Sequence, residues 1–267
     1  MGQIADKLKE LFLPYEKDST FTRDGIVEKN SYYLNKKGNK VEINIDVESA
    51  WCESEKRIAI ILKDQPGSSF DVTKWLKDET DKNENAADNR QLRGTRNCNG
   101  RRTQFIPNIG RIIWGLHNSD KLRFYEYEDS KQMMDDVIKC FNTVPFVLLE
   151  SKKAMGKTSI SNKELGISLQ NDKLFLRELD VLQPNMIVCT SELIYHEVIK
   201  HYKEKQIEIP EHNSIRILPN SGKLVFCSYH PSWWCTRKVY YSVMNHYRAF
   251  LKSKEYQRFK FGKYILE

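Results

Sequence analysis

The sequence of 267 residues predicts an α/β fold, a three-layer αβα sandwich around a central four-stranded, mostly parallel sheet. Four short apolar runs rich in β-branched residues are nearly continuous instead of alternating, which is typical of strands buried on both faces. The segments between them carry apolar residues at helical spacing. Strands that alternate with helices form a parallel sheet covered on both sides.

The predicted strands are residues 57–63, 145–150, 185–190 and 223–229. The predicted helices are residues 107–117, 131–141, 173–182, 191–202 and 238–251. The first of these helices shows the pattern clearly, since its apolar residues recur at helical spacing, at Ile109, Ile112, Ile113 and Leu116.

The first 55 residues predict an appendage to this sheet. Residues 4–13 have the pattern of a short amphipathic helix, and residues 31–34 and 40–45 read as a hairpin joined by Asn and Gly turn residues. Residues 77–104 are rich in Arg and Asn and have no hydrophobic period, so we expect a long insertion loop. We treat the whole chain, residues 1–267, as a single domain.

Composition excludes several classes of protein. The chain has 40% hydrophobic and 30% charged residues with a net charge of +7, which excludes intrinsic disorder and a disulfide-stapled miniprotein. No apolar run approaches the ~20 residues that cross a bilayer, so we expect a cytoplasmic protein with no membrane partner. The six cysteines form no Cys-x-x-Cys pair, so we expect neither a tetrahedral zinc site nor an iron–sulfur cluster.

Polar residues follow the predicted strands at the edge where ligands of parallel sheets bind. Asp64 follows the first strand, Glu150 ends the second, and His230 follows the fourth. Each has a simpler interpretation: Asp64 as a turn residue, His230 as a strand cap, and Glu150 as half of a solvent-exposed ion pair. The convergence of three strand ends favours an enzyme site.

Four short motifs occur in an order found in a known family. Asp64-Gln65-Pro66-Gly67 is similar to a Glu-Ala-Pro-Gly motif, and the stretch from Gln104 to Ile113 resembles one that begins with a base-stacking phenylalanine. Residues 182–188, Leu-Gln-Pro-Asn-Met-Ile-Val, resemble a core strand, and His230-Pro231-Ser232 resembles a closing motif. Over residues 57–250 the chain resembles the uracil-DNA glycosylase superfamily, in particular its iron–sulfur branch.

This resemblance implies a monofunctional DNA glycosylase with a uracil-DNA-glycosylase-like fold. It also implies no metal and no cofactor, since the family's chemistry here uses water and protein groups only. Asp64 would position water and stabilise the positively charged sugar, and His230 would donate to the O2 atom of the departing base. Base-binding roles fall to Gln65, Gly67, Phe105, Glu150 and Ser151, with Phe105 stacking on the flipped base. DNA-binding roles fall to Ser232, Trp233, Trp234, Arg237, Lys153, Arg93, Arg96, Arg101 and Arg102.

Two of these assignments stay open. Trp233 or Trp234 would fill the gap left in the duplex by the flipped base, but adjacent tryptophans could instead belong to the core. Either Glu150 or Ser151 could face the base, because a shift of one residue in a strand exchanges its faces.

Departures from the family pattern indicate the target base. The family commonly has asparagine where this chain has Glu150 or Ser151, and a carboxylate accepts hydrogen bonds only, as from the amino group of cytosine. Gly67 stands where a tyrosine blocks the pyrimidine 5-position in the strictest uracil enzymes. With the arginine-rich insertion, these features favour a 5-modified cytosine, such as glucosylated hydroxymethylcytosine of phage DNA, and an antiviral defence role.

The expected partner is double-stranded or single-stranded DNA, bound by a monomer. Two alternatives remain: repair of uracil or another deaminated base, and a catalytically inactive DNA-binding relative.

Overall fold

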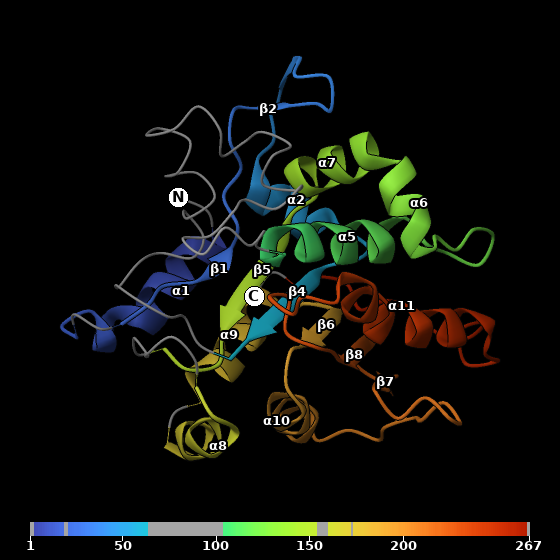
Figure 1. Cartoon of the computed structure of the whole chain (residues 1–267). Helices are drawn as coiled ribbons and strands as arrows, with labels where there is room; N and C mark the ends of the chain where they lie inside the picture. The colour runs from blue at the N-terminus through green and yellow to red at the C-terminus, as the bar shows by residue number, and fades with distance from the viewer. Residues whose placement is uncertain (1–2, 19–20, 64–103, 154–159, 172, 266–267) are drawn as a thin grey trace.

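A six-stranded sheet forms the centre of the protein. The computed structural model describes residues 3–18, 21–63, 104–153, 160–171 and 173–265 (Figure 1). In spatial order the strands are β1 (Gly25–Ile26), β5 (Phe146–Glu150), β4 (Ile58–Leu62), β6 (Met186–Cys189), β8 (Lys223–Cys227) and β7 (Ile215–Leu218). The central four, β5, β4, β6 and β8, are mutually parallel.

These four parallel strands are the four that the sequence predicts. The sheet is nevertheless six-stranded, because β1 pairs antiparallel with β5 at one edge and β7 pairs antiparallel with β8 at the other. Strand β1 has only two residues, too few to show a periodic pattern. Strand β7 turns directly into β8 through Gly222, whose φ of +62° suits a glycine in a tight turn.

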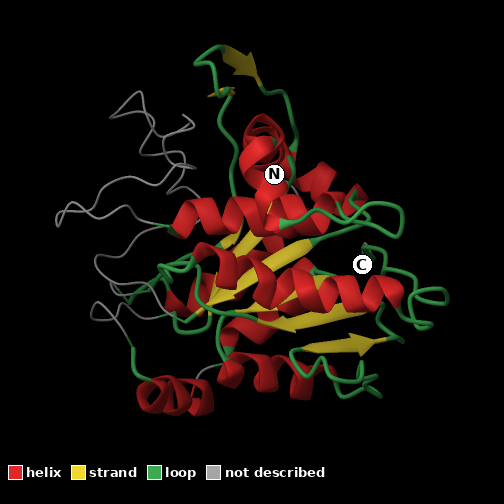
Figure 2. Ribbon diagram, turned by 45° about the vertical axis from the view of Figure 1, so that its right-hand side comes forward, coloured by secondary structure: helices red, strands yellow, loops and turns green. Residues whose placement is uncertain are grey.

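Helices cover both faces of the sheet, which confirms the three predicted layers (Figure 2). One face carries α5 (Phe105–Asn118), α6 (Tyr127–Gln132), α7 (Met134–Thr143) and α11 (Thr236–Lys252). The other face carries α1 (Gln3–Phe12), which continues into a 3₁₀ turn (Leu13–Tyr15), with α2 (Val47–Glu53), α8 (Asn162–Asn171), α9 (Leu174–Leu182) and α10 (Glu192–Tyr202).

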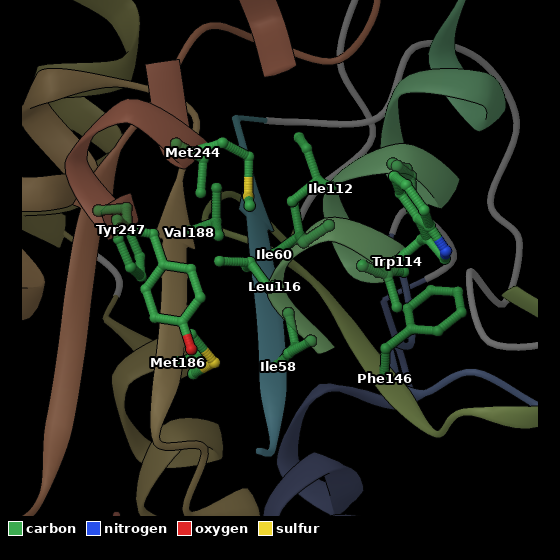
Figure 3. Packing of buried hydrophobic residues seen from close by; sticks show 14 of the residues in the cluster. Ile58, Ile60, Ile112, Trp114, Leu116, Phe146, Met186, Val188, Met244 and Tyr247 are labelled. Atoms are coloured by element: carbon green, nitrogen blue, oxygen red, sulfur yellow. The ribbon is translucent and has the colours of Figure 1, made fainter. Parts of the chain in front are cut away.

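The central strand β4 is buried on both sides. Ile58 and Ile60 belong to the hydrophobic cluster that joins the sheet to α5 and α11, where they lie among Ile112, Val188 and Met244 (Figure 3). Their neighbours Ala59 and Ile61 belong to the cluster on the opposite face. This double burial explains why the strand is continuously apolar in sequence.

The N-terminal segment is only partly an appendage. The predicted hairpin forms a separate two-stranded sheet from β2 (Tyr32–Leu34) and β3 (Lys40–Glu42). The prediction of an appendage is wrong for β1, which belongs to the main sheet. It is also wrong for Trp51, which is fully buried and donates its indole N–H to the Leu182 carbonyl at 2.9 Å.

Helix α5 is held at its C-terminal end by a half-buried lysine. The Lys56 ammonium donates to the carbonyl oxygens of Leu116, His117 and Ser119 at 2.9–3.0 Å. These carbonyls have no partner within the helix, so a cation there satisfies them and complements the helix dipole.

Two further sequence predictions concern the insertion loop and membrane-spanning segments. Residues 77–103 of the expected insertion loop lie outside the described residues, which resume at Gln104, the residue before α5. Within the described part of the chain, none of the helices combines the length and the apolar character required to span a bilayer.

Because β4 is buried on both faces, truncating a side chain on either face should destabilise the protein to a similar extent. Ile60→Ala and Ile61→Ala should each lower the free energy of unfolding by about 2–5 kcal/mol, because each leaves a cavity in a different cluster. Leu122→Ala is the control, since Leu122 is 95% exposed and its loss should change stability by less than about 0.5 kcal/mol. Urea denaturation measures all three; a large loss from only one isoleucine would contradict the two-sided packing.

Candidate functional site

The carboxyl ends of β4 and β6 flank the point where the strand order reverses. The chain passes from β4 to β5 on one side, whereas it passes from β6 toward β8 on the other. Ligands of open parallel sheets bind beside such a point. Lys63 follows β4 there, and residues 228–235, which follow β8, carry His230.

His230 is held in one tautomer by its own loop. Ser232 donates its backbone N–H to His230 Nδ1 at 3.2 Å, and the Ser232 hydroxyl lies 2.8 Å from the same nitrogen. A ring nitrogen that accepts a backbone N–H carries no proton, so in the neutral ring the proton resides on Nε2. The Nε2–H group is therefore the donor that His230 can present to a ligand.

The environment keeps this imidazole neutral. Burial, and to a smaller extent the nearby positive charge of Lys63, lowers the pKa of His230 from the ordinary 6.5 to about 4. Nothing in the sequence alone indicates a role for Lys63. Its charge at the end of β4 disfavours an imidazolium and favours any anion that forms beside His230.

Helix α5 brings a stacking ring and an anchor to the same place. The Phe105 ring lies 6.0 Å from the His230 ring between centroids, with an interplanar angle of 30°. One turn further, buried Asn108 donates from Nδ2 to the Pro231 carbonyl at 2.6 Å and to the Trp233 carbonyl at 3.4 Å. Asn108 thus ties the His230 loop to α5. Sequence analysis missed it, and its only signal was a lone amide in an otherwise apolar helix start.

Aromatic rings are exposed around His230. Trp234 is 82% exposed, and Trp233 is 39% exposed with its ring 4.5 Å from that of Tyr229 between centroids. The alternative that both tryptophans belong to the core is therefore wrong. Exposed Arg237 lies in the first turn of α11 beside this surface, with its guanidinium 5.7 Å from the Tyr241 ring.

The two candidate base readers at the end of β5 lie in different surroundings. Ser151 is buried, and its hydroxyl donates to the Lys63 carbonyl at 2.8 Å. Along β5, Phe146 and Leu148 belong to the cluster on the α5 face, so strand alternation places Glu150 on that face too. Glu150 is 2% exposed and accepts a hydrogen bond from Thr22 Oγ1 at 2.7 Å, which excludes the solvent-exposed ion pair.

The structure contradicts the role predicted for Lys153. It was predicted to contact DNA, but its ammonium is buried and forms ion pairs with Asp24 and with Glu178, the latter at 2.8 Å. Two carboxylates inside the protein use its charge, so it is not available to phosphate. Burial, followed by the nearby charge of Asp24, raises the pKa of Glu178. Lys153 therefore ties the N-terminal segment to α9.

The remaining predicted residues lie outside the described part of the chain. They are Asp64, Gln65, Gly67, Arg93, Arg96, Arg101 and Arg102. Of the two proposed catalytic residues, only His230 is described. The structure brings together His230, Phe105, Ser232, Trp233 and Trp234.

A cavity of about 1020 Å³ lies at the opposite, amino-terminal edge of the sheet. Arg57 lines it, but its guanidinium donates to the carbonyls of Gln183 and Ser54 at 3.0 Å each and to that of Gly262. These bonds give Arg57 a structural role between chain segments. We therefore place the candidate site at the carboxyl edge. Among the described residues, none of the His, Cys, Asp and Glu side chains gather in a group that could hold a metal ion.

The sequence matches no protein-family model, and no curated protein matches it significantly.

The geometry of His230 predicts an unusual titration. An NMR titration of the ring protons should give a midpoint near pH 4 with the proton on Nε2 at neutral pH, and Lys63→Gln should raise that midpoint by removing a positive charge. Since the unfolded chain titrates near 6.5, it takes up the proton first as the pH falls. The free energy of unfolding therefore decreases from pH 6.5 toward pH 4, and His230→Gln should remove this part of the slope. A midpoint near 6.5 would contradict the assignment.

Proposed function

We propose that this chain is a monofunctional DNA glycosylase that hydrolyses the N-glycosidic bond of a flipped pyrimidine and leaves an abasic site. The observation that carries the proposal is the pairing of a neutral histidine, whose proton is fixed on Nε2, with the ring of Phe105 at the carboxyl edge of a parallel sheet. A base-excising enzyme needs both a flat apolar face and a hydrogen-bond donor next to it.

A neutral His230 can act as a hydrogen-bond donor to the departing base. Breaking the bond between sugar and base leaves negative charge on the pyrimidine, and a donor aimed at its O2 atom stabilises that charge as it develops. The positive charge of Lys63 beside His230 acts in the same direction. In this proposal Asp64 positions the attacking water and stabilises the sugar cation.

The proposed target is a 5-modified cytosine, with glucosylated hydroxymethylcytosine of phage DNA as the favoured example. We assign the reading of the cytosine ring to Glu150, which lies on the α5 face and already accepts a hydrogen bond from Thr22 Oγ1; the Ser151 hydroxyl, on the other face, is bound to the Lys63 carbonyl. A carboxylate accepts from an exocyclic amino group and repels the O4 atom of uracil. The modification at the 5-position rests on Gly67 and on the arginine-rich insertion. It implies a role in defence against phage.

The surface around His230 supports a nucleic-acid partner. Trp234, with its ring almost fully exposed, has the position and shape to enter the duplex in place of the flipped base. Arg237 and Ser232, both exposed beside it, have the donors to bind the phosphate backbone. Arg93, Arg96, Arg101 and Arg102 complete the proposed DNA-binding set.

Mass spectrometry of released bases tests this function. The wild-type chain should release the modified base from glucosylated phage DNA and leave uracil-containing duplex intact. His230→Ala should slow release by about 10²–10³-fold, because the donor to the departing base is lost, and Asp64→Asn by about 10²–10⁴-fold. His196→Ala is the matched control, since it removes an exposed histidine from α10 and should leave the rate unchanged.

Two outcomes would replace the proposal. Uracil release at a comparable rate would favour the repair glycosylase. DNA binding without release of any base, unchanged in both active-site variants, would favour the inactive DNA-binding relative.

A further inference from the structure

Helix α11 begins with an unusual concentration of positive charge. The residue before it, Cys235, makes no side-chain capping bond, and the first turn contains no acidic residue. Instead, the first turn carries Arg237 and Lys238, both exposed. The N–H groups at the start of a 17-residue helix bear partial positive charge, although that of Thr236 donates to the Trp234 carbonyl at 3.2 Å. Lys238 and Arg237 add to this charge, and Glu128 of α6 lies near enough to Arg237 to offset part of it. The balance of charge at this end still favours an anion.

A buried arginine lies next to this helix end. Arg111 on α5 is only 9% exposed, and its Nε and Nη1 atoms are buried without a hydrogen-bond partner in the described structure. The contact recorded for its guanidinium is the Tyr127 ring, 5.6 Å away. A guanidinium carries five N–H donors and keeps its charge in proteins.

Three contacts locate Arg111 beside the first turn of α11. The Tyr127 hydroxyl hydrogen-bonds Thr236 Oγ1, on the first residue of α11. One turn before Arg111, Asn108 binds the carbonyls of the loop that leads into α11. One turn after it, Gly115 lies against Tyr240 and Met244 of α11. Figure 1 shows α5 and α11 running side by side on this face of the sheet.

An unpaired buried charge is costly to the folded protein. Desolvation of a guanidinium is compensated only by a well-placed anion or acceptors, and an apolar side chain of similar size is often more stable in the same place. Arg111 therefore has the character of a residue kept for a ligand.

We propose that Arg111 and the first turn of α11 form an anion site that binds a phosphodiester of the DNA backbone next to the flipped nucleotide. A guanidinium binds phosphate through two parallel hydrogen bonds, and a helix N-terminus contributes backbone N–H groups to the same oxygens. The naming of DNA rests on the proposed glycosylase function, whereas the anion site itself does not. Residues 231–235 join His230 to the first turn of α11, so the anion site and the proposed base site are neighbours along the chain.

Thermal unfolding of the full chain tests the anion site without DNA. Inorganic phosphate should raise the melting temperature of the wild type above its value in chloride at the same ionic strength. Arg111→Met should lose this response, and without phosphate it should melt no lower than the wild type, or about 2–4 °C higher, because it removes an unpaired buried charge. Arg111→Lys keeps the charge but not the paired donors, so a reduced response is expected.

Arg258→Met is the matched control. Arg258 is exposed beyond the far end of α11, so the variant loses the same charge and should keep the full response to phosphate.

A series of DNA duplexes tests the identity of the anion. Each duplex carries an abasic analogue and one neutral methylphosphonate at a different linkage. Wild-type affinity should fall about 10-fold when the neutral linkage occupies one position beside the analogue. Arg111→Met should bind with that lower affinity throughout and show no further loss at that position, while Arg258→Met should behave as the wild type.

The outcomes separate this proposal from the glycosylase function. An unchanged phosphate response in Arg111→Met, or a marked loss of its stability without phosphate, would overturn the anion site even if base release is observed. A phosphate response that depends on Arg111, without sensitivity to any methylphosphonate, would overturn the DNA assignment. A response and a sensitivity that both depend on Arg111, without base release by the wild type, would uphold the site and overturn only the glycosylase.

Discussion

The organisation of this protein depends on burial of four parallel strands on both faces of one sheet. Strand β4, at the centre, has no exposed residue, and its side chains alternate between two hydrophobic clusters. A strand in that position can present polar side chains only beyond its ends. Polar groups that act on a ligand are therefore confined to the ends of the central strands. The reversal of strand order selects the carboxyl ends of β4 and β6.

Helix α5 positions the side chains of the candidate site. Its apolar residues pack on the sheet, Lys56 binds the carbonyls at its C-terminal end, and Asn108 binds the His230 loop near its N-terminal end. The same helix carries Phe105, so the stacking ring and the histidine are positioned by one rigid element. A site built on a helix and a short hydrogen-bonded loop keeps its geometry better than one built on loops alone.

The sequence predicted those parts of the fold that have a strong local pattern. The central strands are continuously apolar and α5 has a clear helical period, so both could be recognised without knowledge of their neighbours. Strands β1 and β7 could not, because an edge strand of two to four residues has too short a pattern. The six-stranded sheet differs from the predicted four-stranded one for that reason.

Side-chain roles that depend on distant partners were the least predictable. Lys153 resembled a DNA contact because of its position after β5, but Asp24 and Glu178, which bury its charge, are 129 and 25 residues away in the sequence. His230 and Phe105 were predicted as neighbours from the order of motifs, and their rings do lie together. The tautomer of His230 could not be predicted, since it depends on the turn that brings the Ser232 N–H to Nδ1.

A crystal structure of the chain on a DNA duplex that contains a 2′-fluoro analogue of the modified cytidine would show directly whether His230 and Phe105 bind a flipped base. The fluorine disfavours positive charge on the sugar, so the bond to the base should survive. We expect the extruded base on the Phe105 ring, with His230 Nε2 within hydrogen-bond distance of its O2 atom. A base that remains stacked in the duplex, or DNA bound at the amino edge of the sheet, would contradict it.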